Sequence, residues 1–147
     1  MKSPFKRFVA LLGAIAMALP LLASAQKAPM SKPTVVLVHG AFADSSSWNG
    51  VIQRLHAKGY TVVAAANELR SVKSDAAEVA SVLKNIHGPV VLVGHSYGGS
   101  VISEAASGLD NVKALVYVAA FAPDVGESAG ELAGRFPGSS LGPALAP

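Results

Sequence analysis

The sequence predicts a three-layer α/β fold in which helices cover both faces of a mostly parallel sheet. The first observation is that short apolar runs suited to strands alternate with stretches of helical periodicity. The second is that the strand-like runs, such as residues 34–39, are rich in β-branched residues and lack polar alternation. Such runs are typical of strands buried on both faces, which pair in parallel through right-handed crossovers.

Four strands are expected, each from one apolar run, at residues 34–39, 60–65, 89–93 and 113–119. In open parallel sheets, ligands bind at the carboxyl ends of the strands. The residues directly after these runs are therefore the candidates for chemistry.

Three helices are expected between the strands. Ser45 to Ser47 provide candidate N-caps for the first helix, and Gly59 ends it. Trp48 lies on the apolar face of this helix, where core packing is preferred to a role in lining a substrate pocket. The second helix opens at Asp75 and Glu78, which are spaced as in a capping box. The third runs from about residue 97 to 107.

The first 25 residues have the pattern of a signal peptide. Basic residues open the segment: Lys2, Lys6 and Arg7. An apolar run, 8–22, follows them, and the small residues 23–25 predict cleavage after Ala25. The alternative is an uncleaved anchor, but the run is shorter than the roughly 20 residues that span a bilayer. We therefore expect a periplasmic or secreted protein without a stable membrane anchor.

The rest of the chain divides into three parts. Residues 26–33 form a polar linker, and residues 34–121 form the α/β domain. Residues 122–147 are rich in Gly, Pro, Ala and Ser, with one short helix expected near 127–134. We interpret this last part as the start of a lid or as an irregular tail.

Composition excludes several kinds of partner. The chain carries 12 basic and 9 acidic residues, and three of the basic ones belong to the predicted signal peptide. The remaining chain is neutral, which gives no reason to expect nucleic-acid binding. It contains no cysteine and no cluster of histidines, so neither a metal nor an organic cofactor is expected. Composition leaves the oligomeric state open.

Residues 94–98 read Gly-His-Ser-Tyr-Gly, the G-x-S-x-G pattern of a nucleophile elbow. The pattern follows the predicted strand 89–93 and precedes a predicted helix, as an elbow requires. This turn holds its serine at strained backbone angles and projects the hydroxyl above the sheet. Gly94 and Gly98 lack the Cβ atoms that would clash in it. The pattern predicts Ser96 as the nucleophile; the alternative is an ordinary Gly-rich turn.

A second motif, His-Gly-Ala-Phe, follows the first predicted strand. Gly40 permits a tight turn, so that the N–H of Ala41 or Phe42 faces the nucleophile. The N–H of Tyr97 is the expected second donor of an oxyanion hole. His39 is interpreted as a side chain that braces the loop, in preference to a catalytic role.

The segments VVLVHGAFADSSSW, VVLVGHSYGGSVI and LVYVAAFAPD resemble the α/β-hydrolase superfamily. The similarity is greatest to its small esterase and hydroxynitrile-lyase-like branch, and it covers roughly residues 34–130. It implies the N-terminal half of that fold, truncated after the strand that precedes the cap. It also implies a serine hydrolase that forms an acyl-enzyme on Ser96 from a small ester-like substrate.

The triad implied by the family runs Ser, acid, His along the chain, and no histidine follows Ser96. His56 and His87 fall at helix ends on the opposite edge of the sheet, and His95 lies within the turn beside the nucleophile. Asp124 follows the last predicted strand and is a fallback acid. We therefore expect a catalytically incomplete site. The alternatives are a ligand-binding pseudoenzyme or, in a full-length form, a hydroxynitrile-lyase-like enzyme.

Overall fold

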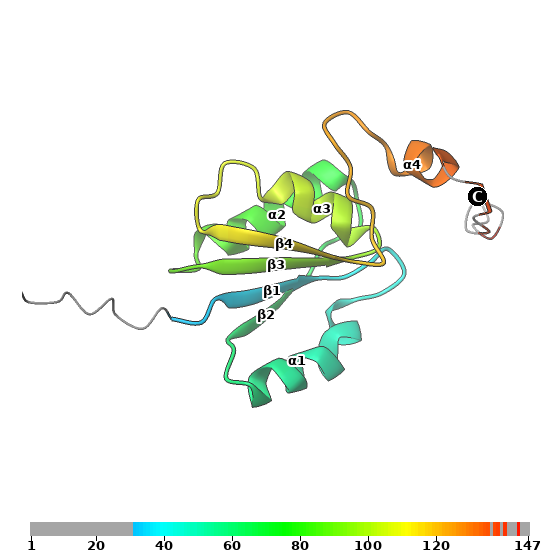
Figure 1. The fold of residues 1–147 in the computed structure, drawn as a ribbon. Helices are drawn as coiled ribbons and strands as arrows, with labels where there is room; N and C mark the ends of the chain where they lie inside the picture. Colours follow the sequence, from blue (N-terminus) through cyan, green and yellow to red (C-terminus); the bar gives the residue numbers. More distant parts are fainter. Residues whose placement is uncertain (1–30, 136, 139, 141–143, 145–147) are drawn as a thin grey trace, which may run out of the picture.

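The computed structural model describes residues 31–135, 137–138, 140 and 144. Strands and helices alternate in it, as Figure 1 shows. In chain order the elements are β1 (Thr34–Val38), η1 (Ser45–Trp48), α1 (Asn49–Ala57), β2 (Val62–Ala65), α2 (Val72–Lys84), β3 (Val90–His95), α3 (Gly98–Ala105), β4 (Val112–Val118) and α4 (Ala129–Arg135). The predicted signal peptide and residues 26–30 of the predicted linker lie outside the described residues.

The four strands form one parallel sheet in the order β2-β1-β3-β4. Helices α2 and α3 lie on one face of the sheet and α1 lies on the other, which gives three layers (Figure 1). The predicted fold class is confirmed. Because all strands run the same way, the loops after β1, β3 and β4 meet at one edge of the sheet.

Alternate residues of β1 supply the two halves of the core. Val36 and Val38 face α2 and α3, in a large cluster with Val79, Leu83 and Ile102. Val35 and Leu37 face α1, in a smaller cluster with Trp48 and Val93. Removing apolar surface from water stabilises a fold by about 25 cal/mol per Å², so most of the hydrophobic stabilisation comes from the α2 and α3 side.

The start of the first helix differs from the prediction. Helix α1 has Trp48 at its N-cap without a side-chain bond, and Asp44 caps the 3₁₀ turn before it: its Oδ1 accepts the N–H of Ser46 at 2.7 Å. Ser45 to Ser47 form a 3₁₀ turn that leads into α1 at Asn49. A carboxylate accepts a hydrogen bond from the helix N-terminus more strongly than a hydroxyl does, which explains this outcome.

The predicted capping box at Asp75 is also wrong. Helix α2 begins at Val72, and the hydroxyl of Ser71 accepts the N–H of Ser74 at 3.1 Å. Asp75 lies inside the first turn and is 1% exposed. A real capping box lies further along the chain, where Ser128 and Glu131 each accept the other's backbone N–H before and within α4.

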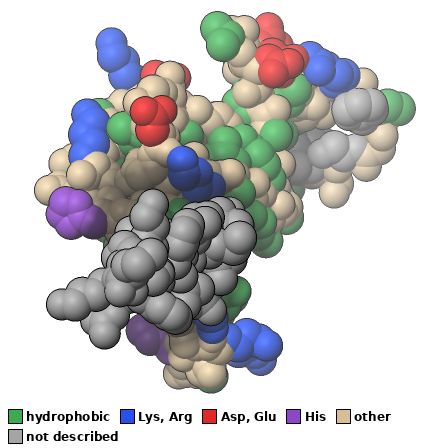
Figure 2. Space-filling view, turned by 60° about the vertical axis from the view of Figure 1, so that its left-hand side comes forward, with side chains coloured by type: hydrophobic (Ala, Val, Ile, Leu, Met, Phe, Trp, Pro, Cys, Tyr) green, Lys and Arg blue, Asp and Glu red, His purple; other side chains and the backbone are tan. Residues whose placement is uncertain are grey.

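Strand β4 is an edge of the sheet as described, since it pairs with β3 alone. Tyr117 donates or accepts a hydrogen bond with Ser103 of α3, so its side chain lies on the α3 face. Val116 and Val118 therefore point to the α1 face, where 41% and 40% of each residue is exposed. Figure 2 gives a view of the surface in which apolar and charged side chains are distinguished.

No helix within the described part of the chain is long and apolar enough to cross a membrane.

Candidate active site

Ser96 lies in a sharp turn between β3 and α3, at the carboxyl edge of the sheet. Its φ of +52° is left-handed, a conformation that costs a residue with a Cβ about 1–3 kcal/mol. The N–H of Ser96 donates to the carbonyl of Val118 at 3.3 Å, and its own carbonyl accepts the N–H of Gly99 at 2.9 Å. The turn is therefore tied both to β4 and to the first turn of α3, which hold the strained serine in place.

The glycines of the motif let strand, turn and helix approach one another. A Cβ on Gly94 would lie 2.5 Å from the carbonyl oxygen of Gly98, and one on Gly98 would lie 2.7 Å from that of Val38. A Cβ on Gly99 would lie 2.2 Å from the carbonyl oxygen of Phe121. These neighbours are backbone atoms, which cannot move aside singly. The predicted steric reason for Gly94 and Gly98 holds, and Gly99 has the same need.

The loop after β1 lies directly against this turn. A Cβ on Gly40 would be 3.1 Å from both the Cβ of Ser96 and the Nδ1 of His95. Within the described residues, the backbone N–H groups of Ala41, Phe42 and Tyr97 donate to no other group of the protein. Phe42 is 88% exposed.

His39 is buried and braces this loop through both ring nitrogens. The N–H of Asn67 donates to Nε2 at 3.3 Å, so Nε2 is an acceptor. Nδ1 then carries the hydrogen and donates to the carbonyl of Gly40 at 2.9 Å. The side-chain amide of Asn67 also donates to the His39 carbonyl. With both ring nitrogens engaged, His39 has none left to take a proton from Ser96.

The other histidines are placed differently. The ring of His95 meets Trp48 edge to face, with centroids 6.3 Å apart, on the α1 side of the sheet. Trp48 is 7% exposed and belongs to the smaller core cluster, as the sequence indicated. His56 is exposed at the end of α1, and His87 is exposed after α2. Both lie at the opposite edge of the sheet from Ser96, since α1 and α2 lead into the amino ends of β2 and β3.

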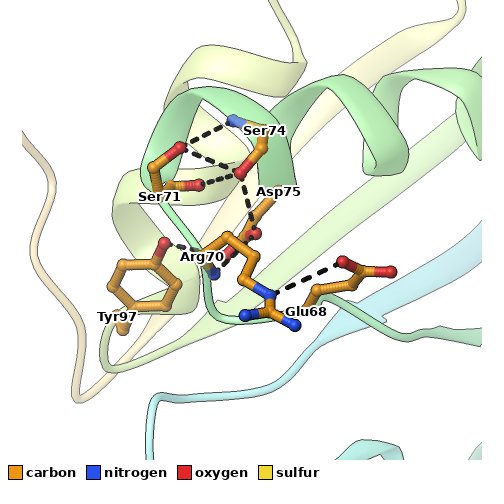
Figure 3. A network of polar contacts seen from close by, with 6 residues as sticks. All are labelled: Glu68, Arg70, Ser71, Ser74, Asp75 and Tyr97. Carbon is orange, nitrogen blue, oxygen red and sulfur yellow. Dashed lines mark hydrogen bonds and ion pairs between the residues drawn. The ribbon is translucent and has the colours of Figure 1, made fainter.

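One pair beside Ser96 was not predicted from the sequence. The hydroxyl of Tyr97 donates to Oδ2 of the buried Asp75 at 2.8 Å (Figure 3). Burial first, and then this hydrogen bond, raise the pKa of Tyr97 to about 12. The sequence does place Asp75 on the apolar face of a helix, beside Ala76, Val79 and Leu83. That position indicates a buried carboxylate, but Asp75 was interpreted as a helix cap instead.

Across the described part of the chain, no three His, Cys, Asp or Glu side chains come together in a way that could hold a metal ion. Asp124 follows β4 and is exposed. Its backbone N–H donates to Glu127 at 2.9 Å, and its carbonyl accepts from the N–H of Glu127. The geometry thus brings together Ser96, Tyr97 and the Gly40 loop, and among the described residues neither a histidine nor a carboxylate forms a hydrogen bond with Ser96.

Comparison with known proteins agrees with this architecture. Residues 35–147 match the family model described as the alpha/beta hydrolase family. The alpha/beta hydrolase nvfD of Aspergillus novofumigatus is 35% identical over 74% of this chain and 51% of its own length. The probable hydrolase R7 of a Phoma species is 32% identical over 67% of this chain and 47% of its own. The chain spans about half the length of these relatives.

Solved structures give the same picture. An extracellular alpha/beta-hydrolase from a Paenibacillus species is similar with a TM-score of 0.63 and 30% identity, over 76% of this chain and 49% of that one. A pyrethroid hydrolase from Sphingobium faniae is similar with a TM-score of 0.54 and 29% identity, over 60% of this chain and 40% of that one. Sheet order, the turn at Ser96 and sequence similarity agree, and this chain belongs to the alpha/beta hydrolase family.

Proposed function

We propose that Ser96 is the nucleophile of a serine hydrolase site that cleaves small carboxylic esters. The observation that carries the proposal is the left-handed φ of +52° at Ser96. If the turn were only a connection, glycine would adopt this conformation without strain. Strain of this kind persists where the surrounding structure holds it, and it clusters at functional sites. Attack of the serine hydroxyl on the ester carbonyl would form an acyl-enzyme and release the alcohol; water would then release the acid.

The oxyanion is assigned to the backbone N–H groups that are free of protein acceptors at this edge. Tyr97 supplies one, at the N-terminus of α3, where the helix dipole also favours negative charge. Ala41 or Phe42 supplies the other from the loop after β1. Gly40 supports this assignment, because the loop lies so close to Ser96 that a Cβ at position 40 would be 3.1 Å from the Cβ of Ser96.

We further propose that these 147 residues are catalytically incomplete on their own. No histidine follows Ser96 in the sequence, and the engaged ring of His39 leaves it unfit as the base. Without a base, the oxyanion donors alone leave a residual rate of about 10³-fold over water in a well-formed site. We expect turnover at that low level.

The test is hydrolysis of 4-nitrophenyl acetate by the purified protein beside Ser96→Ala. Weak turnover that Ser96→Ala abolishes supports the nucleophile. A rate equal in both variants and in buffer removes the catalytic proposal and leaves a ligand-binding pseudoenzyme. That second candidate is favoured because none of the described histidines forms a hydrogen bond with Ser96. It predicts that an ester analogue raises the unfolding temperature without turnover.

We propose export to the periplasm or the medium, on the signal-peptide pattern of residues 1–25. The similarity to a Paenibacillus protein named as extracellular supports it. N-terminal sequencing of the protein recovered from a cell envelope fraction tests the proposal: an N-terminus at Gln26 is expected, and an intact Met1 contradicts it.

A further inference from the structure

Asp75 is a buried carboxylate that the proposed mechanism does not use. It is 1% exposed and lies in the first turn of α2, among the apolar residues that α2 packs against α3. The nearby guanidinium of Arg70 pairs instead with Glu68, with Nε 3.8 Å from Oε2, and both side chains are mostly exposed. Burying a carboxylate is costly unless hydrogen bonds replace its water. Asp75 must therefore be satisfied by other donors.

Three donors meet the carboxylate, as Figure 3 shows. Oδ1 accepts the backbone N–H of Arg70 at 3.2 Å and the hydroxyl of Ser74 at 3.3 Å. Among the described residues, Oδ2 accepts only the Tyr97 hydroxyl, and this is the shortest contact, at 2.8 Å. The two oxygens therefore bind different parts of the protein. Oδ1 binds residues at the start of α2, and Oδ2 binds Tyr97 at the start of α3.

Helix capping does not explain this arrangement, because Ser71 already caps α2. A smaller apolar residue at position 75 would leave the cap intact and would cost no desolvation. What the carboxylate adds is a fixed attachment for Tyr97, the residue that directly follows the strained Ser96.

Because Tyr97 directly follows Ser96, holding its side chain also restrains the backbone of the turn at Ser96. Its backbone, at φ −50° and ψ −36°, closes the turn, and its N–H has no acceptor among the residues that the structure describes. Its ring packs against the larger core cluster, and the far end of the ring is held by Asp75. With ring and hydroxyl both held, the peptide of Tyr97 has little freedom to rotate, so its N–H keeps one direction beside Ser96.

We propose that Asp75 is a positioning residue that, through its hydrogen bond to the Tyr97 hydroxyl, aims the Tyr97 N–H at the site where the oxyanion forms. This inference rests on the proposed function. Helix α2, which carries Asp75, would then help to preorganise the oxyanion donors that stabilise the transition state.

The test compares Tyr97→Phe with Tyr117→Phe. Each removes one hydroxyl and one side-chain hydrogen bond near α3, but the bond of Tyr117 goes to Ser103, away from Ser96. Two quantities are measured: the ¹⁵N order parameter of the residue 97 N–H, and the rate at which a fluorophosphonate labels Ser96. The order parameter of the Leu92 N–H, within β3, reports on the fold as a whole.

In Tyr97→Phe, the order parameter at residue 97 is expected to fall from about 0.85 toward about 0.6, while that of Leu92 stays unchanged. Labelling of Ser96 is expected to slow about tenfold, as for a lost hydrogen bond to a charged group. Tyr117→Phe is expected to leave the order parameter at residue 97 unchanged and the labelling rate within twofold of the wild type. Adding Asp75→Asn to Tyr97→Phe should change labelling by less than about twofold, because the two act through one bond.

Equal order parameters at residue 97 in all variants would overturn the positioning role, whatever the labelling rates. So would a fall at residue 97 matched by a fall at Leu92, which means general loosening. If Ser96 takes no label in the wild type, the proposed function fails. The order parameters then still decide whether Asp75 fixes the turn.

Discussion

Gly40 lies so close to Ser96 that a methyl group on the glycine would stand 3.1 Å from the serine Cβ. The contact joins the loop after β1 to the turn after β3, the two segments to which the oxyanion donors are assigned. Because these strands are neighbours in the sheet, their parallel register delivers both segments to the same edge.

Gly40→Ala is therefore expected to separate the loop from the nucleophile. The new methyl group would lie 3.1 Å from Ser96 and His95, which is closer than an ordinary van der Waals contact. The loop must therefore move by a few tenths of an ångström. Fluorophosphonate labelling of Ser96 should slow about tenfold, with a loss of roughly 1 kcal/mol in unfolding free energy.

Gly50→Ala is the matched control, because its new methyl group would meet only the flexible end of Arg54, at 3.5 Å. It lies within α1 and should raise the unfolding free energy by about 0.5–1 kcal/mol without changing the labelling rate. Unchanged labelling in Gly40→Ala would show that the loop contact does not set the geometry of the site.

The sequence was sufficient for the features that depend on local pattern. The continuous apolar runs at β1 and β3 predict parallel strands, because strands buried on both faces need consecutive apolar residues. The motif at Ser96 predicts the turn, because the turn requires glycines at fixed positions next to the serine. The register that joins Gly40 to Ser96 follows from the sheet order, which periodicity alone does not give.

What the sequence did not reveal were contacts between residues distant along the chain. Asp75 has the spacing of a helix cap, and only the packing of α2 against α3 shows that it bonds Tyr97. The bond at Nε2 of the His39 ring likewise needs Asn67, which comes 28 positions later. Local propensity places an acidic residue near a helix start; tertiary packing decides what it binds.

Ser96→Gly is expected to stabilise the protein while abolishing any labelling. Glycine adopts a φ of +52° without the clash that a Cβ makes, so the unfolding free energy should rise by about 1 kcal/mol. Ser96→Ala keeps the Cβ and should show no such gain. Urea denaturation measures both, and an equal stability of the two variants would mean that the turn stores no strain.

Tyr97 is expected to make stability fall in alkaline solution. The folded state raises the pKa of its hydroxyl from 10.0 to about 12, so folding favours the protonated form. This contribution is complete below pH 10 and is lost as the pH rises through about 12. Unfolding free energies measured between pH 9 and pH 12 should therefore fall less steeply in Tyr97→Phe than in Tyr117→Phe. Parallel slopes would contradict the raised pKa of the Tyr97 hydroxyl.

The exposed face of β4 is expected to drive self-association. Val116 and Val118 point to the α1 side, where a hollow of about 570 Å³ is lined largely by apolar side chains, among them Val91 and Val93. The backbone of β4 is also unpaired on its outer side within the described sheet, and such edges pair with other chains unless charge blocks them.

Val116→Lys should therefore lower the average mass that sedimentation equilibrium gives at high protein concentration, because a charge on this face opposes both apolar contact and edge pairing. Val125→Lys makes the same change at a fully exposed residue beyond the sheet and should leave the association unchanged. A wild-type protein that stays monomeric throughout the concentration range would refute the prediction. An equal fall in mass for both variants would mean that overall charge, not the β4 face, governs association.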